Sequence, residues 1–495
     1  MKRLKLILAT IVAVFATFAG SKALAYDITV NNGGSGTYES YQIFTGDLSD
    51  STLSNVKWGN GITAAGQTAL QNKYNATSAA ELAEKLSAFS TSDTEAFAKE
   101  AAKYLQNPGT LTGLVAGYYL VQNKTVGENE AYTNYILEVV KDVTVEPKTD
   151  VPTVEKKVKD TNDTTGDTSD WQDSADHDIN DKVPFQLTAT LPANYDTYNS
   201  YYLNFSDELS AGLTFNNDAK VYVVNGSDRK EVTNYFYVAA DGSSFAIKDL
   251  KQISVDGVAT ITKDSKIVVE YTATLNNEKA VIGSKGNPNT VELIYSNNPN
   301  NSGDGNQTPG TPPTTPPTPP TPPTETGKTP KDTVIVFTYK TVVNKVDQNG
   351  DALSGAAFAL YKIVGGQEKL VKEYQAGTTT SFEFTGLDDG DYVLKETKTP
   401  AGYNSIADVK FTVTAEHDIL SDNPALTSLS GTAASGEITF TADKTAGSLT
   451  TNVENKKGSI LPSTGSLGTT LLYVIGAALV VGAGVLLVTK KRMEA

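Results

Sequence analysis

The sequence predicts a mostly β protein, with an N-terminal α+β domain followed by two immunoglobulin-like β-sandwich domains in tandem. Most of the 495 residues fall into short runs rich in β-branched and aromatic residues, separated by clusters of Asn, Asp, Gly and Pro. Helical spacing of apolar residues is found near the N-terminus, in residues 78–105. The chain is long enough for about three domains.

Both ends of the chain carry export signals. Residues 1–25 have a basic start, an apolar run and small residues before a predicted signal-peptide cleavage after Ala25. Near the other end, residues 471–488 are uncharged and mostly apolar, which is long enough to cross roughly 30 Å of hydrocarbon as a helix. A basic cluster follows this run and would stay on the cytoplasmic side. We therefore expect a secreted protein with a C-terminal transmembrane helix.

Composition limits the classes of function. The net charge is −16, and it becomes more negative when the basic leader and tail are removed, so nucleic acid and anionic lipid are disfavoured as partners. The chain has no cysteine and therefore cannot form disulfides. Its two histidines, His177 and His417, lie in acidic, polar stretches, and we expect both to be solvated. No metal site, cofactor or hydrolase constellation is indicated.

The first domain is predicted over residues 26–150. After the helical segment, β-rich sequence returns and stops at Pro147, which cannot donate a hydrogen bond to a strand ladder. Lys148 follows directly, at an exposed joint between domains. Another protein can reach an amine at such a joint, although an ordinary surface lysine gives the same pattern.

The second domain is predicted over residues 151–340, and strand alternation indicates three polar side chains in its core. Every second residue of a strand lies on the same face, and Lys156, Asp207 and Asn297 each alternate with apolar neighbours. Asp181 has the same parity relative to its own apolar neighbours and is an alternative to Asp207 as the buried acid. A single inward lysine can also be an edge residue whose amine reaches solvent.

The third domain, residues 341–458, repeats this pattern. Lys345, Glu396 and Asn455 each fall in line with apolar residues of their strands. Two successive domains thus present the order lysine, acid, asparagine on inward faces. Because the same order recurs in both domains, the explanation that each inward lysine is an edge residue by coincidence becomes weaker.

A tract rich in Pro, Thr and Gly covers residues 300–330. Its prolines favour a stiff polyproline II conformation without a core of its own. Residues 334–339 form a β-rich run that continues into the Lys345 strand without a turn signal. We read this run as the last strand of the second domain and the tract as a loop inserted before it. The alternative is a linker, with the third domain starting near Lys331.

Residues 459–495 resemble the cell-wall sorting signal of Gram-positive surface proteins. The pentapeptide Leu461-Pro462-Ser463-Thr464-Gly465 stands before the apolar run and the basic tail, which is the order of an LPxTG signal. The resemblance implies that the cysteine of a membrane sortase attacks the Thr464 carbonyl and that an amine then takes over the acyl group. Residues from Gly465 onward would be removed.

Two further stretches resemble the major pilins of sortase-assembled pili. Residues 353–361, 384–387 and 392–403 look like a Cna-B-type domain, with Glu396 in the place of the pilin E-box glutamate. Residues 143–149 resemble the pilin motif V-x-V-Y-P-K-N, whose lysine accepts the threonine of the next subunit, and here that lysine is Lys148. The motif departs from the pattern at two positions, where Glu146 and Thr149 stand. Nearby lysines compete for the role: Lys141, Lys157 and Lys159.

The buried trios resemble the intramolecular isopeptide sites of pilins and Cna-type adhesins. The resemblance implies the cross-links Lys156–Asn297 and Lys345–Asn455, promoted by Asp207, or Asp181, and by Glu396. Burial disfavours charge, so it leaves a neutral amine beside a protonated acid. The amine is then able to attack the asparagine carbonyl, and ammonia leaves.

The resemblance as a whole implies a structural shaft subunit of a covalent cell-surface pilus, with a role in adhesion and colonisation. Thr464 of one subunit would join Lys148 of the next. The implied partners are pilus-specific and housekeeping sortases, further copies of the chain, ancillary pilins, peptidoglycan and host surface ligands. The implied location is the Gram-positive cell wall. A monomeric wall-anchored adhesin or ancillary pilin is the alternative, and in that case Lys148 would be idle.

Overall fold

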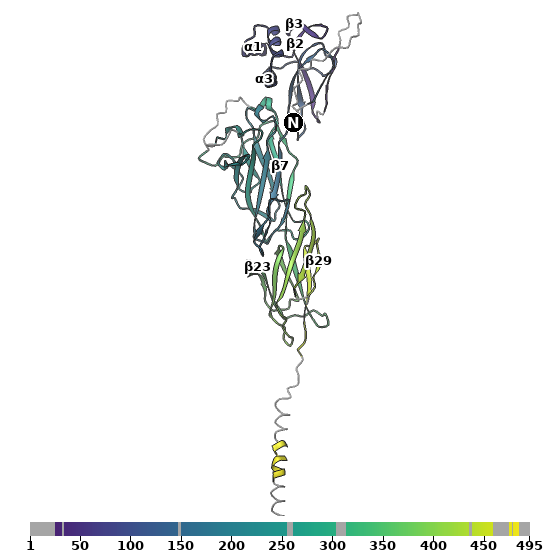
Figure 1. Ribbon diagram of the computed structural model, residues 1–495, viewed down its shortest axis with the longest axis vertical. Helices are drawn as coiled ribbons and strands as arrows, with labels where there is room; N and C mark the ends of the chain where they lie inside the picture. Colours follow the sequence, from purple (N-terminus) through teal and green to yellow (C-terminus); the bar gives the residue numbers. More distant parts are fainter. Residues whose placement is uncertain are drawn as a thin grey trace, which may run out of the picture.

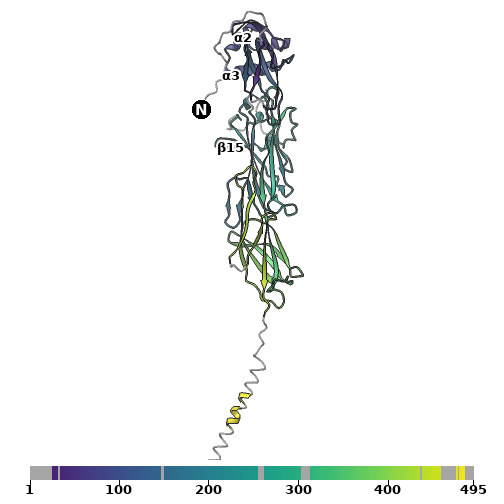
Figure 2. The ribbon, with the colours of Figure 1, turned by 90° about the vertical axis from the view of Figure 1, so that its right-hand side faces the viewer.

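The computed structural model describes residues 25–31, 34–146, 150–254, 261–302, 313–434, 438–458, 475–477 and 479–484. In these residues three domains follow one another along the long axis of the molecule, and two perpendicular views show the same order (Figures 1 and 2). Lys148 and the sorting pentapeptide lie outside the described residues. None of the helices described is long and apolar enough to cross a membrane, and half of the predicted span, 471–488, falls outside the ranges given.

The first domain packs helices against an antiparallel sheet of order β3-β2-β4-β5, and its predicted α+β class is confirmed. Its main elements are β2 (Thr37–Ser49), β3 (Thr52–Trp58), α1 (Ala64–Lys73), α2 (Ala79–Ser87), α3 (Thr91–Ala102), β4 (Gly117–Thr125) and β5 (Asn134–Val139). Hydroxyl N-caps start the three helices, at Thr63, Ser78 and Ser90. A parallel pair joins β1 (Ile28–Val30) to β6 (Val143–Val145), which ends three residues before Lys148.

The second domain is a sandwich of two sheets around one core. The first sheet has the order β10-β21-β19-β12-β17-β16, with β20 beside β19, and the second has the order β15-β14-β18-β11-β7, with β13 beside β18. The strands are β7 (Thr153–Val158), β8 (Thr161–Asn162), β9 (Asp167–Thr168), β10 (Ser174–Asp176), β11 (Lys182–Thr190), β12 (Leu203–Leu209), β13 (Leu213–Phe215), β14 (Lys220–Asn225), β15 (Asp228–Glu231), β16 (Tyr237–Val238), β17 (Ser244–Ile247), β18 (Lys266–Leu275), β19 (Asn287–Ser296), β20 (Thr326–Lys328) and β21 (Asp332–Phe337). Short 3-10 helices are η1 (Tyr195–Thr197), η2 (Thr233–Tyr235), η3 (Leu250–Gln252) and η4 (Pro299–Asn301).

The proline-rich tract lies inside the second domain. Strands β20 and β21, which follow the tract, both pair with β19, which precedes it. The tract is therefore an insertion between strands of one sheet. The chain then passes from β21 into the first strand of the third domain with only Thr338 between them.

The third domain is a second sandwich, with sheets of order β25-β22-β30-β29 and β24-β23-β26-β27-β28. Its strands are β22 (Tyr339–Asp347), β23 (Ala357–Val364), β24 (Gln367–Tyr374), β25 (Ser381–Leu387), β26 (Gly390–Lys398), β27 (Val409–His417), β28 (Leu426–Ala433), β29 (Thr441–Asp443) and β30 (Ser448–Asn455). The first and last strands, β22 and β30, are parallel neighbours. Entry and exit of the chain are therefore joined by one strand pair.

Candidate functional sites: two buried lysine–acid–asparagine clusters

In the third domain the structure brings Lys345, Glu396 and Asn455 together. Lys345 lies opposite Val453 in the parallel pair of β22 and β30, and Asn455 is two residues further along β30. The Lys345 amine is buried and donates to the Val453 carbonyl oxygen at 2.8 Å. The Asn455 Nδ2 donates to Glu396 Oε2 at 3.1 Å and to the carbonyl oxygen of Asn404 at 2.5 Å.

Two oxygen atoms of this cluster are left without partners. Asn455 Oδ1 and Glu396 Oε1 are buried and accept no hydrogen bond from the described residues. Glu396 is held in place through its other oxygen, which also accepts from the Thr399 hydroxyl at 3.0 Å. Orphaned buried oxygens are uncommon in folded proteins and mark a site with unfinished chemistry or a missing partner.

Electrostatics prepare Lys345 as a nucleophile. Burial lowers the pKa of Lys345 to about 8, although the charges of Glu396 and Glu454 act in the opposite direction. A larger share of this amine is therefore neutral near pH 8 than for an exposed lysine, and only the neutral form carries a free electron pair.

The second domain contains an equivalent cluster around Lys156. The Lys156 amine is fully buried, contacts Asp207 Oδ1 and donates to the Tyr271 hydroxyl at 3.1 Å. That hydroxyl donates to Asp207 Oδ2 at 2.5 Å and accepts from Asn289 Nδ2 at 2.7 Å. Asn289 Oδ1 is buried without a partner, as Asn455 Oδ1 is in the third domain. Lysine, acid and asparagine thus meet around one tyrosine.

The predicted partner Asn297 does not lie at this cluster in the structure. It follows the end of β19, where its Nδ2 donates to the carbonyl oxygen of Glu130 at 3.3 Å, at the boundary with the first domain. Asn289 and Asn297 lie on the same face, but eight residues of strand separate them by about 26 Å. Strand alternation predicts which face of a sheet a residue lies on, but it does not predict the residue's position along the strand. The sequence pattern therefore does not distinguish Asn289 from Asn297.

The structure also separates the two candidate acids. Asp181 is 36% exposed in its side chain and lies beside His177, with 3.6 Å between Asp181 Oδ2 and His177 Nδ1. Asp207 is the acid at Lys156. Burial raises the pKa of Asp207, opposed by the Lys156 charge, and burial lowers the pKa of Lys156 to about 8. Both shifts favour the neutral pair.

Two segments of the chain match models of known protein families. Residues 340–424 match the family model described as SpaA, prealbumin-like fold domain, and residues 453–495 match the LPXTG cell wall anchor motif. The chain is 27% identical over 446 residues to the trypsin-resistant surface T6 protein of Streptococcus pyogenes serotype M6, across 77% of this chain and 75% of that protein. Together these matches support a sortase-assembled backbone pilin.

The fold of this pilin agrees with that relationship. The solved T6 backbone pilin of serotype M6 Streptococcus pyogenes matches 90% of this chain and 100% of its own, with a TM-score of 0.56 at 18% identity. The pilin is accordingly a structural subunit of a pilus shaft, anchored to the cell wall through its LPXTG segment. It is a substrate for sortase processing and polymerisation, and it is a structural protein in class.

Two of the lysines that compete with Lys148 as the predicted acceptor have side-chain partners in the structure. Lys148 itself and Leu461, Pro462, Thr464 and Gly465 lie outside the described residues. Lys157 is bound at 2.5 Å to Asp173, and the Lys159 amine lies 5.1 Å from the centre of the Trp171 ring. The segment 147–149 joins β6 of the first domain to the start of the second. Both of these competing lysines therefore have structural partners.

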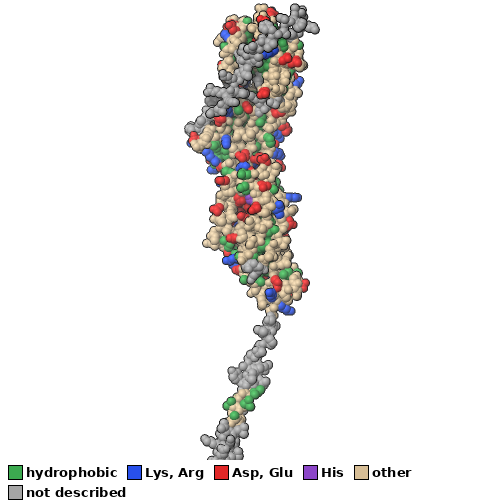
Figure 3. Space-filling view, turned by 45° about the vertical axis from the view of Figure 1, so that its right-hand side comes forward, with side chains coloured by type: hydrophobic (Ala, Val, Ile, Leu, Met, Phe, Trp, Pro, Cys, Tyr) green, Lys and Arg blue, Asp and Glu red, His purple; other side chains and the backbone are tan. Residues whose placement is uncertain are grey.

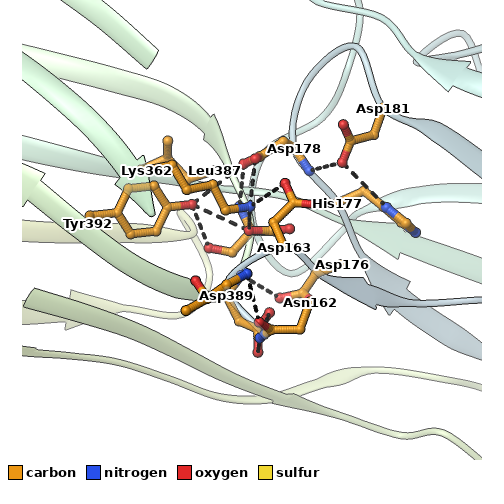
Figure 4. A network of polar contacts seen from close by, with 12 residues as sticks. Asn162, Asp163, Asp176, His177, Asp178, Asp181, Lys362, Leu387, Asp389 and Tyr392 are labelled. Atoms are coloured by element: carbon orange, nitrogen blue, oxygen red, sulfur yellow. Dashed lines mark hydrogen bonds and ion pairs between the residues drawn. The ribbon is translucent and has the colours of Figure 1, made fainter. Parts of the chain in front are cut away.

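The expectation that both histidines of the pilin are solvated is wrong. His177 is buried, and the side chain of His417 is only 8% exposed. The His177 ring contacts residues of its own domain, with Nε2 2.9 Å from the Lys159 carbonyl oxygen and Nδ1 beside Asp181 (Figure 4). Residues 160–181 follow β7 and pack against the third domain, where His417 Nδ1 lies 2.8 Å from the Ser174 hydroxyl. No local pattern in the sequence signals this contact.

Proposed function

We propose that this pilin forms the shaft by linking Thr464 of one copy to Lys148 of the next, and that each copy is locked by the amide bonds Lys156–Asn289 and Lys345–Asn455. The observation that carries the second part is the pair of buried clusters, each with a lysine amine, an acid and an asparagine oxygen that lacks a partner. Two clusters of one composition in successive domains indicate a shared chemistry.

The proposed reaction needs no external reagent. The neutral lysine nitrogen attacks the side-chain carbonyl carbon of asparagine, and the protonated acid donates to the carbonyl oxygen. The acid then moves a proton from the lysine nitrogen to the asparagine nitrogen, the carbon–nitrogen bond breaks, and ammonia leaves. Folding supplies the proximity, which contributes about 7–11 kcal/mol towards such reactions. Each domain reacts once, so the step is maturation and not turnover.

Tyr271 has a positioning role in the second domain. Its hydroxyl contacts all three members of the cluster, donating to Asp207 and accepting from Lys156 and Asn289. Burial, followed by the Asp207 charge, raises the pKa of Tyr271 well above its usual value, so the hydroxyl keeps its proton. The tyrosine therefore aligns the amine and the carboxamide without taking part in the proton transfer.

The polymer joint follows from the position of the acceptor. Lys148 stands between two folded domains, and the donor Thr464 follows the last described residue of the third domain, Gly458, by six residues. Six extended residues span about 20 Å, enough for the sorting segment to leave the domain and enter a sortase. Pilus-specific and housekeeping sortases, ancillary pilins and peptidoglycan are the partners of this proposal. A role in adhesion and colonisation is part of it.

An immunoblot of boiled, wall-digested cells tests the polymer. Wild-type pilin should give a ladder of high mass, and Lys148→Ala should reduce it to the monomer while secretion and folding stay intact. Lys141→Ala, an exposed lysine seven residues away, is the matched control and should leave the ladder unchanged. A ladder that persists in Lys148→Ala rejects this acceptor, and a single wild-type band supports the wall-anchored adhesin instead.

A further inference from the structure

The proline-rich tract inside the second domain repeats one tripeptide. Residues 315–323 read Thr-Pro-Pro three times, and Thr324 begins a further unit that Glu325 interrupts. The described part of the tract, residues 313–325, contains no helix or strand. Proline fixes its own φ at about −65° and keeps the preceding residue extended. The repeat therefore favours a polyproline II helix, which turns once every three residues.

Because the repeat and the polyproline II helix share a period of three, each position of the repeat forms its own edge of the helix. Exposure along the tract has the same period, since Pro317 and Pro320 are half-buried and the other residues from 315 to 324 are exposed. The edge formed by the second proline of each unit therefore lies against the protein. The opposite side presents the first prolines and the threonine edge, which consists of Thr315, Thr318, Thr321 and Thr324.

The C-terminal end of the tract is attached to the folded domain. Glu325 Oε2 accepts hydrogen bonds from Asn298 Nδ2 at 3.0 Å and from Asn301 Nδ2 at 2.8 Å. The next residues form β20, which pairs with β19. The domain thus holds the tract in place, and consecutive hydroxyls of the threonine edge lie about 9 Å apart at a rise of about 3.1 Å per residue.

The hydroxyls of the threonine edge have no partners in the part of the chain that the structure describes. None of the four forms a hydrogen bond with a described residue. Threonines on the strands differ, because their hydroxyls pair across the sheet, as in Thr153 with Thr190 at 2.6 Å and Thr290 with Thr333 at 2.8 Å. The hydroxyls of the tract are therefore open to an external enzyme.

The tract is also uncharged. Acidic and basic side chains are scattered over the face of the three domains seen in Figure 3, whereas residues 313–324 contain none. A nucleic acid or another charged partner therefore has no electrostatic basis for binding the tract. Threonine combined with proline in an uncharged, extended segment is the composition of O-glycosylated stalks.

We propose that the threonine edge is an acceptor site for O-linked sugars. In the reaction, Oγ1 of a threonine attacks the anomeric carbon of a sugar that is activated by a phosphate group at that carbon. The bond between the carbon and the phosphate oxygen breaks, and the phosphate group leaves with the electron pair. A base of the sugar transferase takes the hydroxyl proton. The transferase and the activated sugar come from the cell.

A preformed polyproline II helix suits such an enzyme. Its backbone has no internal hydrogen bonds to break, and a stiff segment loses little conformational entropy when it is bound in extended form. Sugars at intervals of about 9 Å would cover the exposed side of the tract with a hydrated layer. That layer would shield an extended surface segment from proteases. The site is separate from the cross-link clusters and from the polymer joint.

Mass spectrometry of pili released from native cell walls tests the site. After denaturation, a protease that cuts after glutamate releases residues 293–325, which contain the threonine edge and exclude Asn289. The native peptide should show peaks above the sequence mass, separated by the mass of one sugar residue. Mild alkali should remove the sugars, because O-linked sugars are lost from threonine by β-elimination. The same peptide from a chain made by cell-free translation should have the sequence mass.

Variants locate the sugars. Valine keeps the branched shape of threonine and removes the hydroxyl, so valine at all four positions of the edge should abolish the sugar peaks and leave the melting temperature unchanged. Serine at the same positions should keep the peaks. The matched controls are Thr378 and Thr379, which are exposed in the proline-free loop before β25 and should carry no sugar. The quadruple variant is Thr315→Val, Thr318→Val, Thr321→Val and Thr324→Val.

Three results would overturn the proposal. The first is a native peptide at its sequence mass, which would favour recognition of the first prolines by an aromatic groove of another protein instead. The second is a set of sugar peaks that survives in the valine variant. The third is sugar found on Thr378, or on Asn306, which stands in the sequence Asn-Gln-Thr of the same peptide. The polymer and the cross-links are measured on other peptides and are unaffected by these outcomes.

Discussion

Replacing Glu396 tests the cross-link of the third domain most sharply. Glu396→Ala removes the carboxyl group that holds Asn455 at 3.1 Å, and Lys345 and Asn455 both remain. Without an acid to polarise the carboxamide, the amide bond should not form. The domain would then fold as an open chain with an unreacted lysine in its core.

The magnitude follows from the loop that the bond closes. Lys345 and Asn455 enclose about 110 residues, and the chain-entropy model assigns about 5 kcal/mol to a cross-link of that span. For a domain of this size the loss corresponds to a fall in melting temperature on the order of 20 °C. Lys345→Met should lose the same cross-link but cost less, because Glu396→Ala also leaves a buried amine without its acid.

Intact mass and calorimetry measure both effects. Wild-type residues 26–464 should weigh about 34 Da less than their sequence, one ammonia for each bond, and Glu396→Ala should retain a deficit of only about 17 Da. The double variant of Glu396→Ala and Lys345→Met should be no less stable than Glu396→Ala alone. An unchanged deficit in Glu396→Ala would refute its role as the promoting acid. A restored mass with an unchanged melting temperature would refute the entropic argument.

Further predictions concern the second domain and its revised partner. Asn289→Ala should restore about 17 Da of the mass deficit, because one ammonia is no longer lost, whereas Asn297→Ala should leave the deficit at about 34 Da. Intact-mass measurement distinguishes the two variants. The reverse pattern would show that Asn297 is the partner of Lys156. Asp207→Ala should restore the same mass and Asp181→Ala should not. In Asn289→Ala the unreacted Lys156 of the folded protein has a pKa lowered from the ordinary lysine value of 10.5 to about 8. Between these two pH values the unfolded chain binds more protons than the folded chain. Chemical denaturation should therefore show this variant gaining stability as pH rises through that window, while the cross-linked wild type lacks this gain.

Strand alternation predicted which faces of the strands are buried, but it did not predict which residues on a buried face lie next to one another. The inward orientation of Lys156, Asp207 and Lys345 is confirmed. In the third domain Asn455 follows directly from the pairing of the first and last strands, so parity and level coincide. In the second domain Asn289 and Asn297 are equivalent by parity, and only the register of β19 separates them.

The joint between the second and third domains was beyond local sequence patterns. In the sequence His177 lies in an acidic, polar stretch, and of the acids in residues 160–181 only Asp181 is in line with the apolar residues of a strand. The partners of this stretch are His417 and Lys362, about 200 residues away or more, and only the packing of two domains brings them together.

The central claim is that Thr464 of one copy is bonded to Lys148 of another, and it is tested most directly by tandem mass spectrometry of pili released from cell walls. The account predicts a branched peptide in which the Thr464 carbonyl carbon is joined to the Lys148 amine, without residues from Gly465 onward. A branched peptide at Lys141, Lys157 or Lys159, or Thr464 found only on a peptidoglycan amine, would contradict it.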